Sequence, residues 1–364
     1  MTARERIMAF FHGEEPDKIP VFAYDASILG GQQGGWARRL QARGMGITRL
    51  VPPHQPYFFH PNDVNPGADD ITYIETHYIE KGLPKRRLAL ETPVGCISSV
   101  VVGSPPPSEN YACAATEEPF VKELADWRVV NYVFKRITDV LRPNYTAQKR
   151  MDDEVGDQGV VVSILDRTPF QRAWVDLADP VRAALDFKER PAEIEEYLDV
   201  QKALHERIAE IAAESPIQVF NVVENLTNII SPPYFSQYCT PFYKMYQKAF
   251  EGRDAVLGAH FDGQIGHITK EIGDAHLDYI DSYTVPPVGD VSLTEAKRLW
   301  PGLRLWINCP PHLAQAEPDE VRAGYELIAE EWGSKTGIAV NHIEEIPVYK
   351  WEEHLSAALD AFGY

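Results

Sequence analysis

The run AVLGAHFDG, residues 255–263, decides the fold that we predict for this chain. It is apolar until it ends in His260 and Asp262. Three further runs in the second half of the chain have the same form: IQVFNVVEN (217–225), LRLWINCPP (303–311) and GIAVNHIEE (337–345). Near-continuous apolar runs are typical of parallel strands that are buried on both faces. The sequence therefore predicts a parallel sheet of the α/β class.

Four more stretches complete the set of predicted parallel strands. They are IPVFAYD (19–25), ITRLVP (47–52), GVVVSILD (159–166) and LDYIDSYT (277–284). Helical patterns separate most of the eight stretches, as expected for βαβ units. Eight such strands predict a single (β/α)8 TIM barrel domain over residues 1–364. An open doubly wound sheet is the alternative, but no GxGxxG or GxxxxGK[ST] follows the first strand.

Residues 70–102 follow a different pattern from the rest of the chain. Apolar and polar residues alternate on both sides of the turn KGLPK, residues 81–85. This period of two is typical of antiparallel strands that are exposed on one face. We therefore expect an antiparallel β-hairpin inserted into the barrel.

Composition and charge narrow the classes of function. The chain is 44% hydrophobic, 24% charged and carries a formal net charge of −19. Such an acidic protein repels nucleic acid and other polyanions. No apolar run approaches the length of a membrane span, and the four cysteines are too irregularly spaced for a disulfide framework. We expect a cytoplasmic protein that binds neither nucleic acid nor membranes.

The polar residues that end the apolar runs are the candidate catalytic groups. In a barrel of parallel strands the active site lies at the carboxyl ends of the strands. The candidates are His260, Asp262, Glu224 and His342. Side chains alternate along a strand, so His260 and Asp262 point the same way. They could share a metal ion, the acid could orient a catalytic imidazole, or the two could form a structural hydrogen bond.

A zinc site is one interpretation of the same residues. Zinc accepts imidazole, thiolate and carboxylate ligands together. Glu224, His260, Asp262 and Cys309 would supply all of them. The alternatives are a buried, unreactive Cys309 and a Glu224 that caps a helix or forms a salt bridge.

Aromatic and polar residues near the strand ends could line a substrate pocket. Most aromatic residues of a barrel belong to its core, but a few could contact a flat organic molecule. Arg167, beside the run 159–166, could hold one carboxylate, as could Arg172. The candidate substrate-binding residues are Tyr24, Asp25, Arg167, Phe261, Tyr283, Trp306 and Asn308.

Several segments resemble the uroporphyrinogen decarboxylase superfamily. They are RERIMAFFHGEEPDKIPV (4–21), ISPPYFSQYCTPFY (230–243), HFDG (260–263), LDYIDSYTVPPVGDVSLTEAKRLWPG (277–302) and IEEIPVYKW (343–351). The resemblance implies a (β/α)8 barrel, which agrees with the strand count. The superfamily includes decarboxylases and corrinoid-dependent methyltransferases.

The chain looks more like the methyltransferases of this superfamily that act on methoxylated aromatic compounds. The arginine-rich motif of the decarboxylases is absent, and the corresponding residues 24–39 read YDASILGGQQGGWARR. The strand ends Glu-Asn, His-x-Asp-Gly and Asn-Cys-Pro are similar to those of the methyltransferases. Zinc-dependent relatives carry His-x-Cys where this chain has Asp262.

This resemblance implies an enzyme that moves the methyl group of an aryl methyl ether to cobalt(I). The cobalamin would be carried by a separate corrinoid protein, because the barrel accounts for the whole chain. Zinc would be the resident metal; without zinc, His260 would be the acid, oriented by Asp262, with Glu224 and His342 assisting. A homodimer is left open. The alternatives are a decarboxylase, a methyltransferase with another donor such as a methylated amine or thiol, and a non-catalytic barrel that serves as a binding scaffold.

Overall fold

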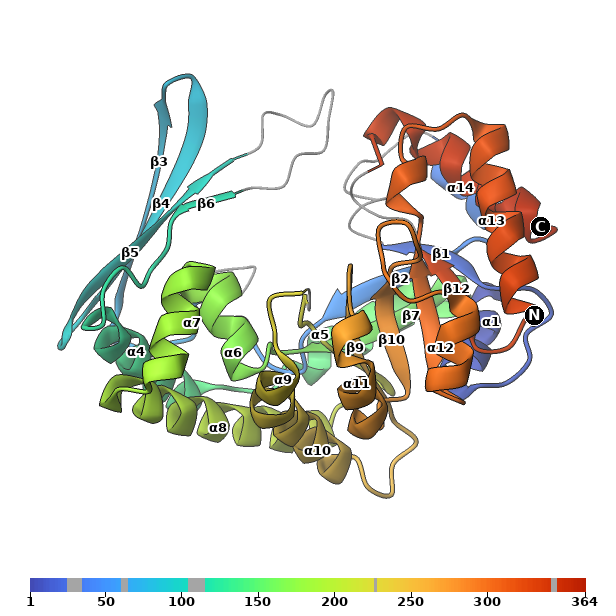
Figure 1. Ribbon diagram of the computed structural model, residues 1–364. Helices are drawn as coiled ribbons and strands as arrows, with labels where there is room; N and C mark the ends of the chain where they lie inside the picture. The colour runs from blue at the N-terminus through green and yellow to red at the C-terminus, as the bar shows by residue number, and fades with distance from the viewer. Residues whose placement is uncertain (25–34, 60–64, 104–114, 226–227, 342–345) are drawn as a thin grey trace.

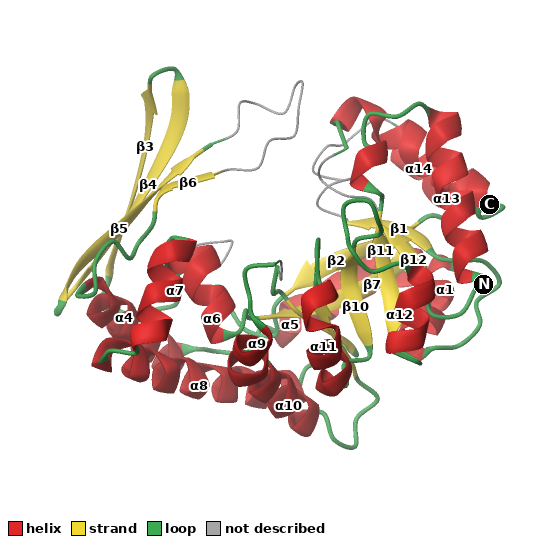
Figure 2. Ribbon diagram, in the orientation of Figure 1, coloured by secondary structure: helices red, strands yellow, loops and turns green. Residues whose placement is uncertain are grey.

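Eight parallel strands form a closed barrel, as the sequence predicts (Figures 1 and 2). The structure is a computed structural model that describes residues 1–24, 35–59, 65–103, 115–225, 228–341 and 346–364. Around the ring the strands follow the order β1-β12-β11-β10-β9-β8-β7-β2. Their bounds are β1 (Val21–Tyr24), β2 (Gly46–Val51), β7 (Gly159–Leu165), β8 (Val219–Val222), β9 (Val256–His260), β10 (Tyr279–Tyr283), β11 (Arg304–Asn308) and β12 (Ile338–Asn341).

Helices surround this barrel on the outside (Figure 1). They are α1 (Ala3–His12), α3 (Trp36–Arg43), α4 (Asp126–Val140), α5 (Tyr145–Val155), α6 (Pro169–Arg172), α7 (Pro180–Glu189), α8 (Ala192–Ala213), α9 (Pro232–Tyr238), α10 (Thr240–Ala249), α11 (Thr269–Ala275), α12 (Leu293–Leu299), α13 (Pro318–Trp332) and α14 (Trp351–Ala361). Ala173–Leu177 is a π-helix, η2. Short 3-10 turns are η1 (Gly156–Gln158), η3 (Gly266–Ile268), η4 (Pro311–Leu313) and η5 (Val348–Lys350). Among the described residues, no helix has the length and apolar character needed to cross a membrane.

Helix α1 closes the amino-terminal end of the barrel. Its first turn is fixed by a capping box between Thr2 and Glu5. Phe10 and Phe11 of this helix are fully buried and pack against residues of the barrel interior. The Phe11 ring lies 5.0 Å from that of Tyr279 and 6.0 Å from that of Trp306. The barrel is therefore filled by apolar side chains at this end.

The inserted element is larger than the hairpin predicted for residues 70–102. It is a four-stranded antiparallel sheet of β3 (Thr72–Glu80), β4 (Leu83–Thr92), β5 (Gly95–Val102) and β6 (Ala115–Glu118). The prediction was incomplete because the sequence ETPVG, residues 91–95, is a second turn, which leads into β5. The sheet follows β2 in the chain and stands apart from the barrel, with β4 and β5 beside α4 (Figure 2).

Candidate active site at the carboxyl end of the barrel

The barrel interior changes from apolar to polar along its strands. Phe22, Tyr279 and Trp306 form its apolar layer, in which the Phe22 and Trp306 rings lie 4.7 Å apart. Side chains two positions apart face the same side of a strand. The next inward positions, toward the carboxyl ends, are therefore those of Tyr24, Asn221, His260, Asp281, Asn308 and Asn341. The structure thus gathers polar groups at the end of the barrel opposite α1.

Asp281 is the centre of this polar layer. One of its carboxylate oxygens, Oδ2, accepts hydrogen bonds from Asn221 Nδ2 at 2.6 Å and pairs with His260 Nδ1 at 3.0 Å. The other oxygen, Oδ1, accepts a hydrogen bond from the Tyr24 hydroxyl at 3.4 Å. Asp281 is 2% exposed. A carboxylate that binds Nδ1 fixes the orientation of an imidazole and directs Nε2 elsewhere.

A backbone irregularity directly follows Asp281. The pairing of β10 with β11 shifts register between Ile280 and Tyr283, and Ser282 has a φ of 63°. A positive φ is strained for a residue other than glycine. Bulges of this kind redirect side chains next to active sites. Here the bulge turns Tyr283 out of the barrel, where its hydroxyl donates to the Val291 carbonyl at 2.6 Å.

His260 also faces a second carboxylate. Its Nε2 lies 3.9 Å from Asp262 Oδ2. Burial raises the pKa of Asp262, and the positive charges of His260 and Arg167 only partly oppose this effect. An imidazole between one anchoring carboxylate and one readily protonated carboxyl can hold and deliver a proton. The two residues predicted as a pair are thus together, with Asp281 as a third member.

The amide side chains of the polar layer retain unused hydrogen-bonding capacity. Asn341 is fully buried, and neither its Oδ1 nor its Nδ2 has a partner among the described residues. The same is true of Oδ1 of Asn221 and Oδ1 of Asn308. Buried polar atoms are costly unless they are hydrogen-bonded. These atoms are available to a polar group of a bound molecule.

Glu224 lies in a different environment from His260. Tyr243 donates a hydrogen bond to Oε1 at 2.7 Å, and the Thr168 hydroxyl and amide donate to Oε2 at 3.0 and 3.2 Å. Tyr243 belongs to α10, so Glu224 faces the layer between the barrel and its helices. Complete burial raises the pKa of Glu224 to about 7, although these hydrogen bonds act in the opposite direction.

This raised pKa predicts a pH dependence of stability that the variant Glu224→Gln lacks. The folded state binds the Glu224 proton more tightly than the unfolded state, whose carboxyl has a pKa of about 4.3. The free energy of unfolding therefore falls as the pH rises from about 4.5 to about 7, by roughly 3 kcal/mol from this group alone. We expect urea unfolding of Glu224→Gln at a series of pH values to show a smaller decrease. Parallel curves for both proteins would contradict this assignment.

Cys309 also points away from the polar layer. It follows Asn308, so alternation along β11 turns it toward the helices. It is fully buried, and its Sγ lies 3.9 Å from Nδ1 of His354 in α14. Cys309 therefore packs between β11 and α14, which agrees with the alternative interpretation of a buried, unreactive cysteine.

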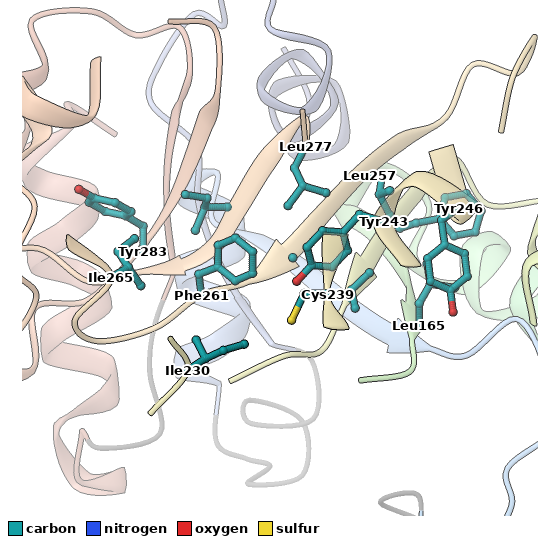
Figure 3. Close-up of a cluster of buried hydrophobic side chains, with 14 of the residues drawn as sticks. Leu165, Ile230, Cys239, Tyr243, Tyr246, Leu257, Phe261, Ile265, Leu277 and Tyr283 are labelled. Atoms are coloured by element: carbon teal, nitrogen blue, oxygen red, sulfur yellow. The ribbon is translucent and has the colours of Figure 1, made fainter. Parts of the chain in front are cut away.

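Phe261 likewise lies outside the barrel interior. Its ring packs edge-on against Phe235 at 5.9 Å, and it lies next to Tyr243 and Cys239 in the layer between strands and helices (Figure 3). Phe261 and Tyr283 are thus structural where the sequence suggested contacts with substrate. Tyr24, Trp306 and Asn308 do belong to the interior, with the Tyr24 and Trp306 rings 5.8 Å apart.

Two arginines follow β7 and have different surroundings. Arg167 contacts Asn225 Oδ1 at 2.6 Å and Asp176 at 3.4 Å. Arg172 is 2% exposed and pairs with Asp166 at 2.9 Å and with Asp176 at 3.3 Å. Arg172 is therefore a structural residue, whereas Arg167 is less deeply buried, with 17% of its side chain exposed.

The proposed zinc ligands do not come together. Within the described ranges, no three histidine, cysteine, aspartate or glutamate side chains are placed to hold a metal ion. Glu224 and Cys309 face the helices, and both Glu224 oxygens already accept hydrogen bonds. This set of four does not fit zinc. Asp25, His342 and Glu344 lie outside the described residues.

One solved structure supports the fold. A methyltransferase from Methanosarcina mazei overlays on the chain with a TM-score of 0.57 and 14% identity, covering 99% of this chain and 98% of its own. A chitinase from Chromobacterium violaceum gives a TM-score of 0.42 at 10% identity over 95% of this chain and 99% of its own. No protein-family model and no curated protein matches the sequence.

Three residues of the site were not among the sequence candidates: Asp281, Asn221 and Asn341. Each is a polar residue at an inward position of a predicted strand. Asp281 and Asn221 stand inside the runs LDYIDSYT and IQVFNVVEN, where an unpaired polar side chain would be costly to bury. This energetic cost is the feature of the sequence that could have indicated a buried polar network.

Proposed function

We propose that this protein is a methyltransferase that demethylates a methoxylated aromatic compound, with the corrinoid of a separate protein as methyl acceptor. The proposal rests on one observation: His260, held by Asp281 and facing Asp262, stands at the carboxyl end of the barrel. A full-length fold shared with a methyltransferase from Methanosarcina mazei is consistent with it. The superfamily resemblance of the sequence supplies the methyl donor and acceptor.

The chemical task of such an enzyme is to release a phenolate. In the proposed reaction, the methyl carbon bonds to the cobalt(I) of the acceptor, whose electron pair forms the new bond. The electron pair of the broken carbon–oxygen bond stays on the ring oxygen. This oxygen is a poor leaving group unless it is protonated. His260 Nε2 donates that proton, and the Asp281 carboxylate orients the ring and stabilises the charged imidazole. Asn308 and Asn341 would position the donor.

The proposal is tested by mixing the purified protein with a cobalt(I) corrinoid and a panel of methoxylated aromatics. We expect at least one donor to change the cobalt absorption spectrum, with the matching phenol as second product. A protein that leaves every donor intact but releases carbon dioxide from a porphyrinogen would be a decarboxylase. Transfer from a methylated amine or thiol alone would replace the aromatic donor.

A further inference from the structure

Strand β3 forms one edge of the inserted sheet and is exposed along its length. In the sheet order β3-β4-β5-β6, no other strand of the described residues pairs with its outer side. All of its nine residues except Tyr73 are exposed, including the large apolar side chains of Ile74, Tyr78 and Ile79. The hairpin of β3 and β4 projects beyond the neighbouring helices (Figure 1). This edge is therefore open to another strand.

The edge lacks the features that usually protect an exposed strand from pairing. Natural proteins protect such edges with lysine, proline, bulges or very short strands. The sequence of β3, TYIETHYIE, contains neither lysine nor proline. Its pairing with β4 runs without a bulge from Thr72, opposite Glu91, to Glu80, opposite Leu83. A long, regular edge rich in threonine, tyrosine and isoleucine is a template for a further strand.

The backbone of β3 turns alternate peptide groups toward this edge. The Gly103 amide donates to the Pro84 carbonyl at 2.8 Å, so the polar backbone of Pro84 faces β5 and not β3. Ile79 lies opposite Pro84. Hydrogen-bonded and non-hydrogen-bonded pairs alternate along an antiparallel ladder. The N–H and C=O groups of Ile79, and of every second residue before it, therefore point outward from the sheet.

The sequence of β3 is complementary to itself when two copies run antiparallel. We consider two copies whose Thr76 residues lie opposite each other. Every pair from residue 73 to residue 79 then joins two apolar side chains, an acidic with a basic one, or the two threonines. The pairs are Tyr73 with Ile79, Ile74 with Tyr78, Glu75 with His77, and Thr76 with itself. Pairs of these kinds stabilise adjacent strands.

The neighbouring alignments lack this complementarity. A centre on Glu75 would place two carboxylates opposite each other, and a centre on His77 would place Ile74 opposite Glu80. Like charges that lie directly opposite each other destabilise a strand pair. The alignment centred on Thr76 is therefore the favoured one.

Contacts within one copy are compatible with this alignment. Glu75 Oε1 lies 2.7 Å from His77 Nε2, and Oε2 accepts a hydrogen bond from the Tyr73 hydroxyl at 3.0 Å. Arg86 lies 3.8 Å from Glu75. A second copy would add its own imidazole on the outer side of this carboxylate, so opposite charges would alternate around the centre without loss of the existing contacts.

We infer that β3 is the interface of a homodimer, in which two copies pair β3 with β3 antiparallel about a two-fold axis at Thr76. The two inserted sheets then form one continuous sheet. A second copy is the partner that fits, because the edge is complementary to itself. A contact of this kind uses the same surface on both subunits and closes after two copies.

Sedimentation velocity of the full chain across a concentration series tests this inference. We expect a concentration-dependent dimer. Thr76→Lys should weaken association by about fivefold or more, because it places two ammonium groups opposite each other at the axis. Thr76→Glu should have the same effect, and an equimolar mixture of the two variants should restore the dimer. Thr146→Lys, at an exposed position of α5, is the matched control and should dimerise like the wild type.

Disulfide formation tests the alignment itself. Opposite residues of a non-hydrogen-bonded pair have Cα atoms about 4.5 Å apart, which a disulfide can span. Thr76→Cys should therefore give a covalent dimer under mild oxidation. The two copies of Ile74→Cys would lie four positions apart along the edge, about 14 Å, and should not cross-link more than the wild type, which has the same native cysteines.

Three results would overturn the inference. They are a monomer at every concentration, a dimer that Thr76→Lys leaves as strong as before, and equal cross-linking of Thr76→Cys and Ile74→Cys. Pairing of this edge with a different protein, in a chain that does not bind itself, would also replace the homodimer. Circular dichroism of each variant confirms that the sheet has folded.

Discussion

Replacing His260 by glutamine should lower kcat for an ordinary aryl methyl ether by about 10²- to 10⁴-fold, the usual contribution of a general acid. Glutamine is close in size to histidine and can still bind Asp281 Oδ2, which now accepts from His260 Nδ1 at 3.0 Å. A glutamine amide is not a general acid, because it cannot give a proton to the leaving oxygen and then take up another from solvent. The expected loss therefore measures proton transfer to the departing oxygen.

Donors with different leaving groups distinguish proton donation by His260 from a purely structural role of this residue. A ring with nitro substituents yields a phenolate that departs without protonation, so the variant should approach wild-type rates on that donor. A loss of equal size for all donors would show that His260 does not supply the proton. His276→Gln, at an exposed position after α11, is the control and should leave kcat unchanged.

The second large effect concerns stability. Arg172→Met should lower the free energy of unfolding by about 3–5 kcal/mol, because the buried Asp166 carboxylate loses its guanidinium partner and keeps His54 Nε2 at 3.7 Å. Burial alone would raise the pKa of Asp166, but the Arg172 guanidinium, 2.9 Å away, holds it down at about 2. The same substitution removes the bond to the Phe59 carbonyl.

Urea unfolding of three variants tests this expectation. Arg150→Met removes an exposed pair with Glu154, whose atoms are 3.7 Å apart, and should change stability by less than about 0.5 kcal/mol. The double variant Asp166→Leu/Arg172→Met should recover part of the loss, because no unpaired charge remains. An Arg172→Met protein within 1 kcal/mol of wild type would contradict a structural role for this network.

The barrel could be predicted because its strands are buried on both faces and appear as long apolar runs. For the same reason, the sequence does not show which residues of a strand point inward. In LRLWINCPP, Trp306 and Ile307 are equally apolar, so nothing indicates that Asn308 faces the interior and Cys309 the helices. The zinc interpretation required the opposite orientation of Cys309.

His260 and Asp262 could be recognised because alternation relates two polar residues on the same strand end. Asp281 was harder to recognise, because it stands inside the run LDYIDSYT and not at its end. Tyr283 was misplaced because the bulge at Ser282 changes the alternation after Asp281. The pairing of Asp281 with Asn221 joins residues 60 positions apart and depends on the order of strands around the ring.

The closure of the amino-terminal end of the barrel by Phe10 and Phe11 of α1 has a kinetic consequence. Because α1 closes the amino-terminal end of the barrel, the donor and the acceptor of the proposed reaction both approach from the carboxyl end. We expect a compulsory sequence of events: the aromatic donor enters first, the macromolecular acceptor then covers it, and the phenol departs only after that acceptor has left.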